Sequence, residues 1–463
     1  MVGSMAMTKL RATRIPGPRP LPLIGNVLRF RRHGLLMPYL RDWRYYGDVL
    51  LYRFGPAKLV AVCHPDELRQ IFIKRRDRYA KGTSVLSIVP LLGDGLFVAD
   101  GEHWQRQRRL LHRLFTANAV RAHERAMLAA IEALLDRWRI LPPGETVDIF
   151  GDMSHLAMDV ICRTMFGVAA DNDIYELGHA VTEAFSWVGE EGLRLLHLPV
   201  AVPTPRNRRF LRAKTKIHNL LQNMISRRRA RGRDQSTADL LDLLLQASDE
   251  DSGEQMTDAQ VINEVVTIFV AGHETTAVCL TWTWLLIAGH ADTESKLHEE
   301  LDRVLGNRSP TLADIPELRY TRQIIDESLR LYPPVWTDPR EAVADDEIAG
   351  YPIRAGTVLM PVLYATHRHP DFWPDPERFS PERFSVQASK GRHPMAHAPF
   401  GGGPRVCLGM AFALQEMVLA IASIAQRFRL QRSYGTVMDM DALAGTLRPK
   451  WPALIDLHRR KTD

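Results

Sequence analysis

Helical periodicity of apolar residues dominates the chain, and alternating segments appear only near both ends. Apolar positions recur at spacings of three and four from Asp66 to about Ile140, and again from Val147 to Leu305, which predicts helices in both stretches. Alternation on either side of Gly55-Pro56 predicts an early hairpin. Short strands are expected again at 341–353 and 358–360.

The remaining segments connect these elements. Residues 83–101 are apolar but rich in Gly and Pro, which favours a long irregular loop, and 361–409 are too dense in Pro and Gly for regular elements. A final helix is expected from Leu408 to about Phe428. Strand segments so far apart must pair with one another, so we expect one integrated domain over 16–463, mainly α with a small β region. Residues 1–15 are expected to be a disordered or vector-derived lead.

The longest apolar run extends from Val261 to Ala288. His273 and Glu274 lie at its centre, where a bilayer would penalise them by several kcal/mol, so we interpret it as a buried core helix. Thr257 and Gln260 form a capping box at its start. The N-terminus lacks the apolar core of a signal peptide. We therefore expect a soluble, cytoplasmic protein without a membrane anchor.

Composition narrows the function classes. The 463 residues are 45% hydrophobic and 25% charged, and 60 basic against 54 acidic residues give a net charge of +6. No dense basic stripe with interleaved aromatics is present, so nucleic-acid binding is not expected. The basic tract 227–233 is interpreted as a solvated helix end, with an acidic protein partner as the alternative. Four cysteines without CxxC spacing indicate a reducing compartment: Cys63, Cys162, Cys279 and Cys407.

The segment Phe400 to Gly409 is the most informative stretch. Three glycines allow the backbone to approach something large and flat, and Cys407 comes just before a helix start, where a thiolate is favoured. Arg405 offers positive charge to an anionic ligand. A lone thiolate does not suit zinc or an iron–sulfur cluster, which need about four protein ligands, but it suits haem iron. The alternative is that Cys407 is only a small buried hydrophobe.

This segment resembles the haem-binding signature of the cytochrome P450 family, Phe-x-x-Gly-x-Arg-x-Cys-x-Gly. All five fixed positions of the signature are filled, by Phe400, Gly403, Arg405, Cys407 and Gly409. The resemblance implies the P450 fold, with heme b (iron protoporphyrin IX) between the long central helix and the cysteine loop. Cys407 is then the axial ligand of the iron. The resemblance also implies haem contacts from Phe400, Gly401, Gly409 and Ala271.

A second segment, Ala271 to Thr276, interrupts the apolar helix. Gly272 costs about 1 kcal/mol against Ala in a helix interior, so small side chains here suggest room for a ligand. Thr275 can bond back to a carbonyl, and an acid beside a hydroxyl can pass protons into an apolar pocket. The alternative is a kinked core helix. The stretch resembles the family's oxygen-activation motif, which implies that Glu274 delivers protons and that the Thr275 hydroxyl steadies dioxygen.

Other motifs agree with the resemblance. Glu327 and Arg330 match the family's Glu-x-x-Arg motif, and Arg383 in the segment 381–384 is its expected third partner, although 376–379 is a similar segment that contributes Arg378. The resemblance implies that this network holds the cysteine loop. It also implies that three residues bind the haem propionates, namely Trp104, Arg108 and Arg340, together with Arg405. Surface charges at Arg106, Arg109 and Arg113 suit an acidic electron donor.

The resemblance therefore implies a bacterial-type haem-thiolate monooxygenase. Such an enzyme inserts one oxygen atom from O2 into a lipophilic small molecule, here a terpenoid, fatty acid or polyketide-like compound. Electrons are expected from a separate ferredoxin or flavodoxin-type donor with its reductase. The alternatives are a peroxide-using or isomerising haem-thiolate enzyme and a non-enzymatic haem sensor. Substrate contacts are expected from 83–100, 184–204 and 333–338, including Val85, Leu86, Ile88, Val89, Leu91, Leu92, Phe185, Trp187, Val335 and Trp336.

Overall fold

The structure is a computed structural model. It describes residues 14–33, 36–167, 172–192, 198–231, 239–247, 253, 255–442, 445–450 and 452–460. The expected lead at 1–15 falls almost wholly outside these residues, as do most of the loop expected at 249–255, the end of the basic tract at 232–233 and part of the segment 184–204.

The chain is mainly helical, as predicted. The α-helices are α1 (Val27–His33), α2 (Leu36–Tyr46), α3 (Pro65–Arg69), α4 (Val89–Leu92), α5 (Gly101–His112), α6 (Ala117–Arg121), α7 (Glu124–Arg139), α8 (Ile149–Phe166), α9 (Asn172–Gly192), α10 (Pro205–Arg231), α11 (Leu240–Gln246), α12 (Asp258–Ile287), α13 (Ala291–Leu305), α14 (Arg319–Leu331), α15 (Leu363–Thr366), α16 (Val386–Ser389) and α17 (Met410–Arg427).

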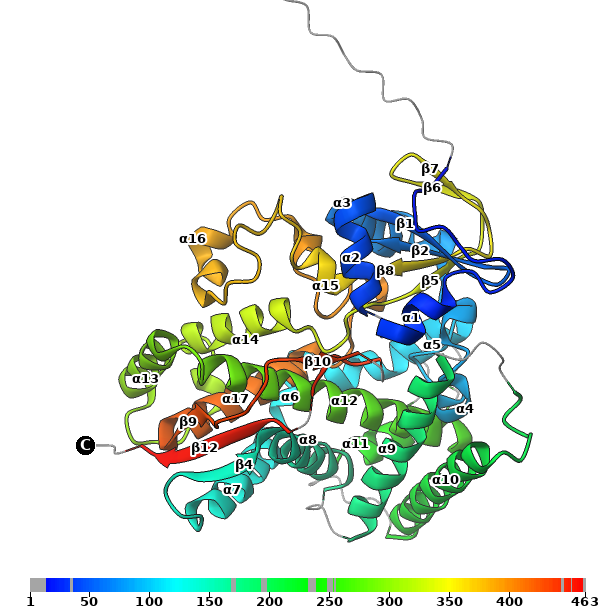
Figure 1. Cartoon of the computed structure of the whole chain (residues 1–463). Helices are drawn as coiled ribbons and strands as arrows, with labels where there is room; N and C mark the ends of the chain where they lie inside the picture. The colour runs from blue at the N-terminus through cyan, green and yellow to red at the C-terminus, as the bar shows by residue number, and fades with distance from the viewer. Residues whose placement is uncertain are drawn as a thin grey trace, which may run out of the picture.

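Helix α12 passes through the middle of the molecule, with α8, α14 and α17 packed around it (Figure 1). Its apolar side chains form the centre of the largest hydrophobic cluster. The predicted capping box is present, since the Thr257 hydroxyl accepts from Gln260 N at 3.3 Å and Gln260 Oε1 accepts from Thr257 N at 2.9 Å. Among the described residues, α12 alone is long and apolar enough to span a bilayer, and 72% of its most apolar window is buried inside the protein.

The strands lie mainly in two places, at one end of the molecule and near the C-terminus of the chain (Figure 1). The strands are β1 (Val49–Phe54), β2 (Ala57–Val62), β3 (Tyr79–Ala80), β4 (Glu145–Asp148), β5 (Arg340–Ala342), β6 (Asp346–Ile348), β7 (Tyr351–Ile353), β8 (Val358–Pro361), β9 (Phe428–Arg432), β10 (Met440–Asp441), β11 (Arg448–Pro449) and β12 (Leu454–Arg459).

Strands distant in sequence pair, as expected for one integrated domain. The main sheet has the order β1-β2-β8-β5-β3, in which β2 and β8 run parallel. A second sheet joins β4, β12 and β9. The early hairpin is confirmed as β1–β2, whereas the hairpin expected over 341–353 is confined to β6 and β7, because β5 leaves it to pair with β8. The strands β4, β9 and β12 were not predicted, since they fall beside strongly helical segments.

Candidate active site

The cysteine loop reaches its position by a close approach of backbone to backbone. Gly403 has φ of +66°, and a Cβ there would lie 1.9 Å from the carbonyl oxygen of Phe72, so only glycine fits. Cys407 N donates to the Phe400 carbonyl at 2.9 Å and closes the loop. Helix α17 begins at Met410, three residues after the thiol. The sequence therefore places Cys407 in front of a helix, on a loop whose shape is fixed.

The thiol environment differs from the prediction in one respect. Burial raises the pKa of the Cys407 thiol, and the Gly409 N–H and the Arg108 guanidinium, which both lower it, only partly offset this effect. The Gly409 N–H acts in the direction expected at a helix start, but burial outweighs it. A thiolate here needs a cation in direct contact with the sulfur, as a bound metal ion provides.

Exposed positions inside the helical layers mark an open space beside the thiol. The Cys407 side chain is exposed although protein surrounds it, and Ala271 is exposed although Val270 and His273 on the same helix are buried. A Cβ added to Gly409 would meet no atom within 4 Å. Room for a ligand is thus left beside Ala271 on α12 and beside Cys407 and Gly409 on the cysteine loop.

Cations gather at one side of this loop. Arg405 donates to Asp100 and to the Ala99 carbonyl, and its guanidinium lies 4.4 Å from the centre of the Trp104 ring. Arg340 binds both carboxylate oxygens of Asp338, Nη2 to Oδ2 at 2.8 Å. Sequence reasoning proposed these arginines and Trp104 but gave them no carboxylate partners within the protein.

Lys81 is a member of this cluster that sequence reasoning missed. Its Nζ donates to Asp338 Oδ1 at 2.7 Å, and the side chain is almost fully buried. Burial lowers the pKa of Lys81 to about 8, although Asp338 acts in the opposite direction. Arg108 lies near enough to Cys407 for each group to affect the pKa of the other. Lys81, Arg108, Arg340 and Arg405 together form a cationic rim with two acids, Asp100 and Asp338.

The centre of α12 shows two different uses of small side chains. A Cβ on Gly272 would lie 2.8 Å from Ile161 Cδ1 of α8, so this glycine permits close helix packing. The room expected from small side chains in this segment is therefore at Ala271, which faces open space, and not at Gly272. Thr275 Oγ1 donates to the Ala271 carbonyl at 2.6 Å, as predicted from the tendency of helical Thr to bond back by one turn.

Glu274 does not act on its neighbouring hydroxyl in this structure. Its Oε1 accepts from the Thr446 hydroxyl at 2.9 Å and from Arg448 Nε, and the residue is buried. Thr446 and Arg448 lie in or just before β11, far from α12 in sequence. Residues from the C-terminal part of the chain thus hold the acid, whereas the neighbouring Thr275 bonds within α12.

A buried ion pair supports the segment that leads to the cysteine loop. Arg330 Nε and Nη2 bind the two oxygens of Glu327 at 2.7 and 2.8 Å, and both residues have no exposed surface. Arg383 Nε lies 3.5 Å from Glu327 Oε1. Arg378 contributes only its carbonyl, to Arg330. The preference for Arg383 over Arg378 as the third partner is therefore confirmed.

Comparison with known proteins agrees with this geometry. The family model described as Cytochrome P450 matches residues 15–456. The chain belongs to the cytochrome P450 family. A solved cytochrome P450DA heme domain superposes with a TM-score of 0.87 at 27% identity, over 97% of this chain and 98% of that chain. The predicted fold class is thereby confirmed.

The curated relatives of this P450 include named oxygenases. The cyclooctat-9-en-7-ol 5-monooxygenase of Streptomyces melanosporofaciens is 36% identical over 91% of this chain and 90% of the relative. Pentalenene oxygenase of Streptomyces avermitilis is 30% identical over 94% of this chain and 95% of the relative. This P450 is accordingly an oxidoreductase that incorporates oxygen, with a haem-iron cofactor.

The residues present fit a haem. Among the described residues Cys407 belongs to no group of three or more metal-ligating side chains, so a metal there must bring most of its ligands with it, as haem does. The cationic rim offers donors of the kind that bind propionate carboxylates. When bound, the haem supplies the activation of oxygen, which no side chain of the protein provides.

Several residues expected to contact substrate lie elsewhere in this P450. Trp187 stacks on Phe210 at 4.3 Å and donates to Asn207, so it joins α9 to α10. Trp336 is buried in the cluster around α2 and β1. The apolar pattern could not separate pocket residues from packing residues. Two short helices, residues 82–85 and α4, interrupt the loop expected at 83–101, and Leu91 and Leu92 are buried against the core.

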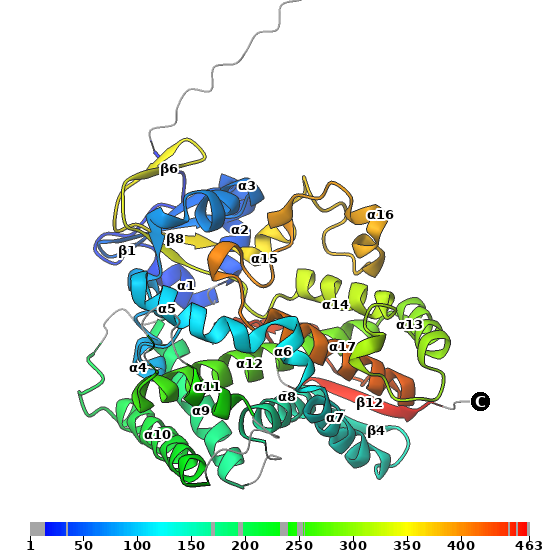
Figure 2. The ribbon, with the colours of Figure 1, turned by 180° about the vertical axis from the view of Figure 1, so that it is seen from behind.

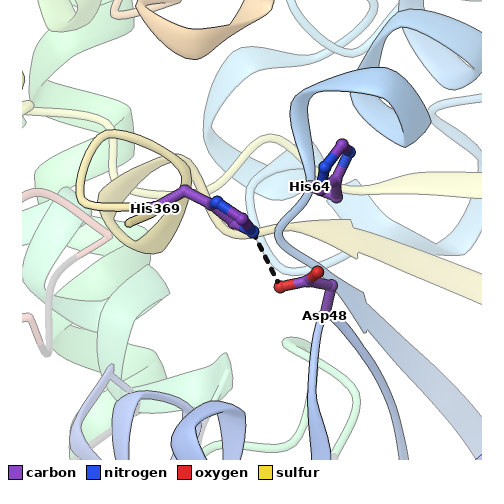
Figure 3. A group of neighbouring side chains, drawn as sticks. All are labelled: Asp48, His64 and His369. Atoms are coloured by element: carbon purple, nitrogen blue, oxygen red, sulfur yellow. Dashed lines mark hydrogen bonds and ion pairs between the residues drawn. The ribbon is translucent and has the colours of Figure 1, made fainter. Parts of the chain in front are cut away.

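A second polar cluster, away from the cysteine loop, consists of Asp48, His64 and His369 (Figure 3). Each histidine Nδ1 accepts a backbone N–H two residues ahead, at 3.1 Å for His64 and 3.3 Å for His369. The proton of each neutral ring is then on Nε2, and His369 Nε2 donates to Asp48 at 3.2 Å. A metal ligand needs the opposite arrangement, with a lone pair on Nε2. This cluster therefore joins β1 to the segment after α15.

Proposed function

We propose that this P450 is a monooxygenase that inserts one oxygen atom from O2 into a cyclic terpenoid. The observation that carries the proposal is a single thiol, Cys407, which is exposed on a fixed loop although protein surrounds it, as is Ala271 of α12. We propose heme b as the cofactor, with Cys407 as its axial ligand. The cytoplasm is the proposed location.

The roles of the surrounding residues follow from their chemistry. Arg405, Trp104, Arg108 and Arg340, joined by Lys81, bind the haem carboxylates through charged hydrogen bonds. The haem faces are proposed to lie against flat surfaces that are left by Phe400, Gly401, Gly409 and Ala271. Because the rim already contains Asp338, which binds both Arg340 and Lys81, these two cations are held in place before the cofactor arrives.

Proton delivery is the proposed role of Glu274 and Thr275. Thr275 Oγ1 donates to Ala271 O and keeps its lone pairs for a donor in the open space. Glu274 is held by Thr446 and Arg448, so it reaches that space only by leaving this pair. On leaving these partners the carboxylate can take up a proton from water and pass it on at the open space.

The terpenoid substrate class rests on the relatives. The names of three matched relatives, two of them named oxygenases, include cyclooctat-9-en-7-ol, cyclooctatin and pentalenene, and these relatives share 30 to 36% of their residues with this chain over nearly its full length. Apolar residues from α4 suit such compounds. A ligand screen in which only compact charged molecules shift the haem spectrum would reject this class.

Electrons are proposed to come from a separate ferredoxin or flavodoxin-type donor with its reductase. Helix α5 carries Arg106 and Arg109, and Arg113 directly follows it. Arg108, which lies near Cys407, is on the same helix. Complementary charge of this kind accelerates encounter with an acidic protein.

Two measurements test the proposal. The reduced protein with carbon monoxide should show the absorption of a thiolate-ligated haem, Cys407→His should lose it, and Cys63→Ala, at a buried cysteine, should keep it. Turnover with a surrogate ferredoxin and reductase under labelled O2 should then place the label in the product. Unlabelled product would favour the peroxide-using or isomerising alternative, and haem binding without any turnover would favour the sensor.

A further inference from the structure

The segment from Lys81 to Asp100 forms a loop whose two ends meet. Asp100 accepts from the backbone N–H groups of Lys81 and Gly82, at 3.1 and 3.0 Å, and so closes the base of the loop. The Lys81 ammonium lies 4.5 Å from the centre of the Phe97 ring. The base is therefore fixed beside the cationic rim, and the position of the rest of the loop depends on contacts with α12.

The main contact is a carboxylate that the proposed mechanism does not use. Glu264 on α12 has no exposed surface, and its two oxygens face Leu96 N at 2.9 and 3.2 Å. Among the described residues no cation pairs with it. A buried acid of this kind normally has a charged partner, so its retention beside a loop N–H calls for an explanation.

Neighbouring contacts extend this junction. Asn263 Nδ2 donates to Asp94 Oδ1 at 2.6 Å. A Cβ on Gly95 would lie 2.3 Å from the Thr267 hydroxyl oxygen, and a Cβ on Gly93 would lie within 2.5 Å of the Asn263 amide. Both glycines therefore allow the loop to lie directly on the helix.

The junction lies on the face of α12 that borders the open space. Glu264, Thr267 and Ala271 are spaced by three and four residues, which places them on one helix face. Seven residues separate Glu264 from Ala271, about 10 Å along the axis. Helix α4, which precedes the junction, also packs against α12 in both views (Figures 1 and 2). The loop is thus a wall of the space next to Ala271.

We propose that Glu264 is a positioning residue that latches the 93–98 segment onto α12 and thereby sets how readily bulky ligands enter the space beside Ala271. The latch rests on the haem site of the proposed function, but not on the reaction. The latch affects the entry of bulky ligands more than that of small ones, because the loop must lift from α12 to widen the space.

The protonation state of Glu264 makes the latch depend on pH. Burial raises the pKa of Glu264 to about 7; the Leu96 N–H acts against this effect and Asp94 adds to it. Opening the loop exposes the carboxyl to water and returns its pKa toward about 4.3. The open state then binds fewer protons, so a rise in pH through 7 favours opening.

Other titratable groups near the junction are few. Asp94 lies on the loop, and His103 of α5 contacts the Asp94 carbonyl at 3.0 Å and its carboxylate at 3.7 Å. On the described parts of α8, α10 and α11, which also pack against α12, no charged group acts on the Glu264 carboxyl. Because His103 contacts Asp94, the test must compare variants at each pH.

Amide hydrogen exchange at Leu96 in the haem-loaded protein tests the latch directly. Glu264→Ala should lower the protection of this amide by about tenfold at both pH 6 and pH 8, since its acceptor is gone. Glu264→Gln keeps an acceptor oxygen but cannot ionise. It should match the wild type at pH 6 and protect Leu96 more than the wild type at pH 8.

Two further variants keep the result interpretable. Gly95→Ala should lift the loop from its own side, through the clash with Thr267, and should reproduce Glu264→Ala if the latter folds poorly. Asp152→Asn removes a half-buried acid that binds Trp138 on α7 and should leave Leu96 unchanged. Equal protection of Leu96 in the wild type, Glu264→Ala and Gly95→Ala would overturn the latch.

Azole binding measures the consequence for ligands. Imidazole and 4-phenylimidazole both bind haem iron and differ in size, so their association rates report how easily each enters. Glu264→Ala should raise the rate for 4-phenylimidazole several-fold relative to imidazole, and Glu264→Gln should lower it relative to the wild type at pH 8. Unchanged rate ratios would overturn the proposal. A chain that binds no haem would instead reject the proposed function, so the two failures are distinguishable.

Discussion

The two sides of the open space are held by different numbers of contacts. On the side of the cysteine loop, Arg330 donates five hydrogen bonds, two to Glu327 and three to backbone carbonyls, and both residues are completely buried. On the α12 side, Glu264 faces a single backbone N–H, and Glu274 is held by two partners from one segment. The first side therefore fixes the thiol, and the second can change its contacts while the fold persists.

The largest effect is expected from Glu327→Ala. It leaves Arg330 as an uncompensated buried charge, which costs roughly 3–5 kcal/mol of unfolding free energy. Thermal unfolding and haem content should both show the loss. Arg383→Ala should destabilise the protein more than Arg378→Ala, because Arg378 contributes only a carbonyl, which the substitution keeps. Equal effects of these two substitutions would mean that the Arg383 side chain is no part of the network.

A large effect on chemistry without an effect on folding is expected from Thr275→Ala. The variant should bind haem and substrate, because the hydroxyl bonds only to Ala271 O. Product formed per electron pair should fall by about tenfold, with peroxide released instead, since proton delivery loses a positioned group. Thr275→Ser keeps the hydroxyl and should restore coupling. Full coupling in Thr275→Ala would remove Thr275 from the proposed proton path.

An intermediate effect is expected at the rim that joins the two sides. Lys81→Met removes one of the two cations on Asp338 and should speed haem transfer to apomyoglobin several-fold, because a charged hydrogen bond to a haem carboxylate is lost. Lys58→Met, at an exposed position of β2, should have no effect. Identical haem transfer from both variants would show that Lys81 serves only the protein's own carboxylates.

The smallest effect is expected from Arg448→Gln, which frees Glu274 from its ion pair. The protein should still fold and bind haem. Turnover should rise by about two- to fivefold with a changed solvent isotope effect, because the acid no longer has to leave Arg448 to reach the open space. Arg354→Gln, at an exposed ion pair, is the control. An isotope effect equal to that of the wild type would show that release of Glu274 does not limit proton transfer.

Sequence motifs predicted the parts of the site that are continuous in the chain. The loop from Phe400 to Gly409, the Glu327–Arg330 pair and the capped helix α12 each carry their signal within about ten to thirty residues. Local spacing is sufficient there, because backbone geometry converts it directly into proximity.

Contacts between distant segments could not be predicted. Arg448 and Glu274 lie 174 positions apart, and Gly272 meets Ile161 on another helix. Trp187 and Trp336 are as apolar as any pocket residue, yet they pack into cores elsewhere. Periodicity gives the buried face of a helix but not which neighbour covers it, so these partners required the folded structure.

The strand β12 has a consequence for how the chain is completed during synthesis. It is the last strand in chain order and joins β4 to β9, and Arg448 comes only shortly before it. A growing polypeptide that already contains α12 and the cysteine loop therefore still lacks β12, which joins the two other strands of this sheet. It also lacks Arg448, the cation that pairs with Glu274. Tags or deletions close behind Arg460 are expected to disturb maturation more than equal changes in the turn between β6 and β7.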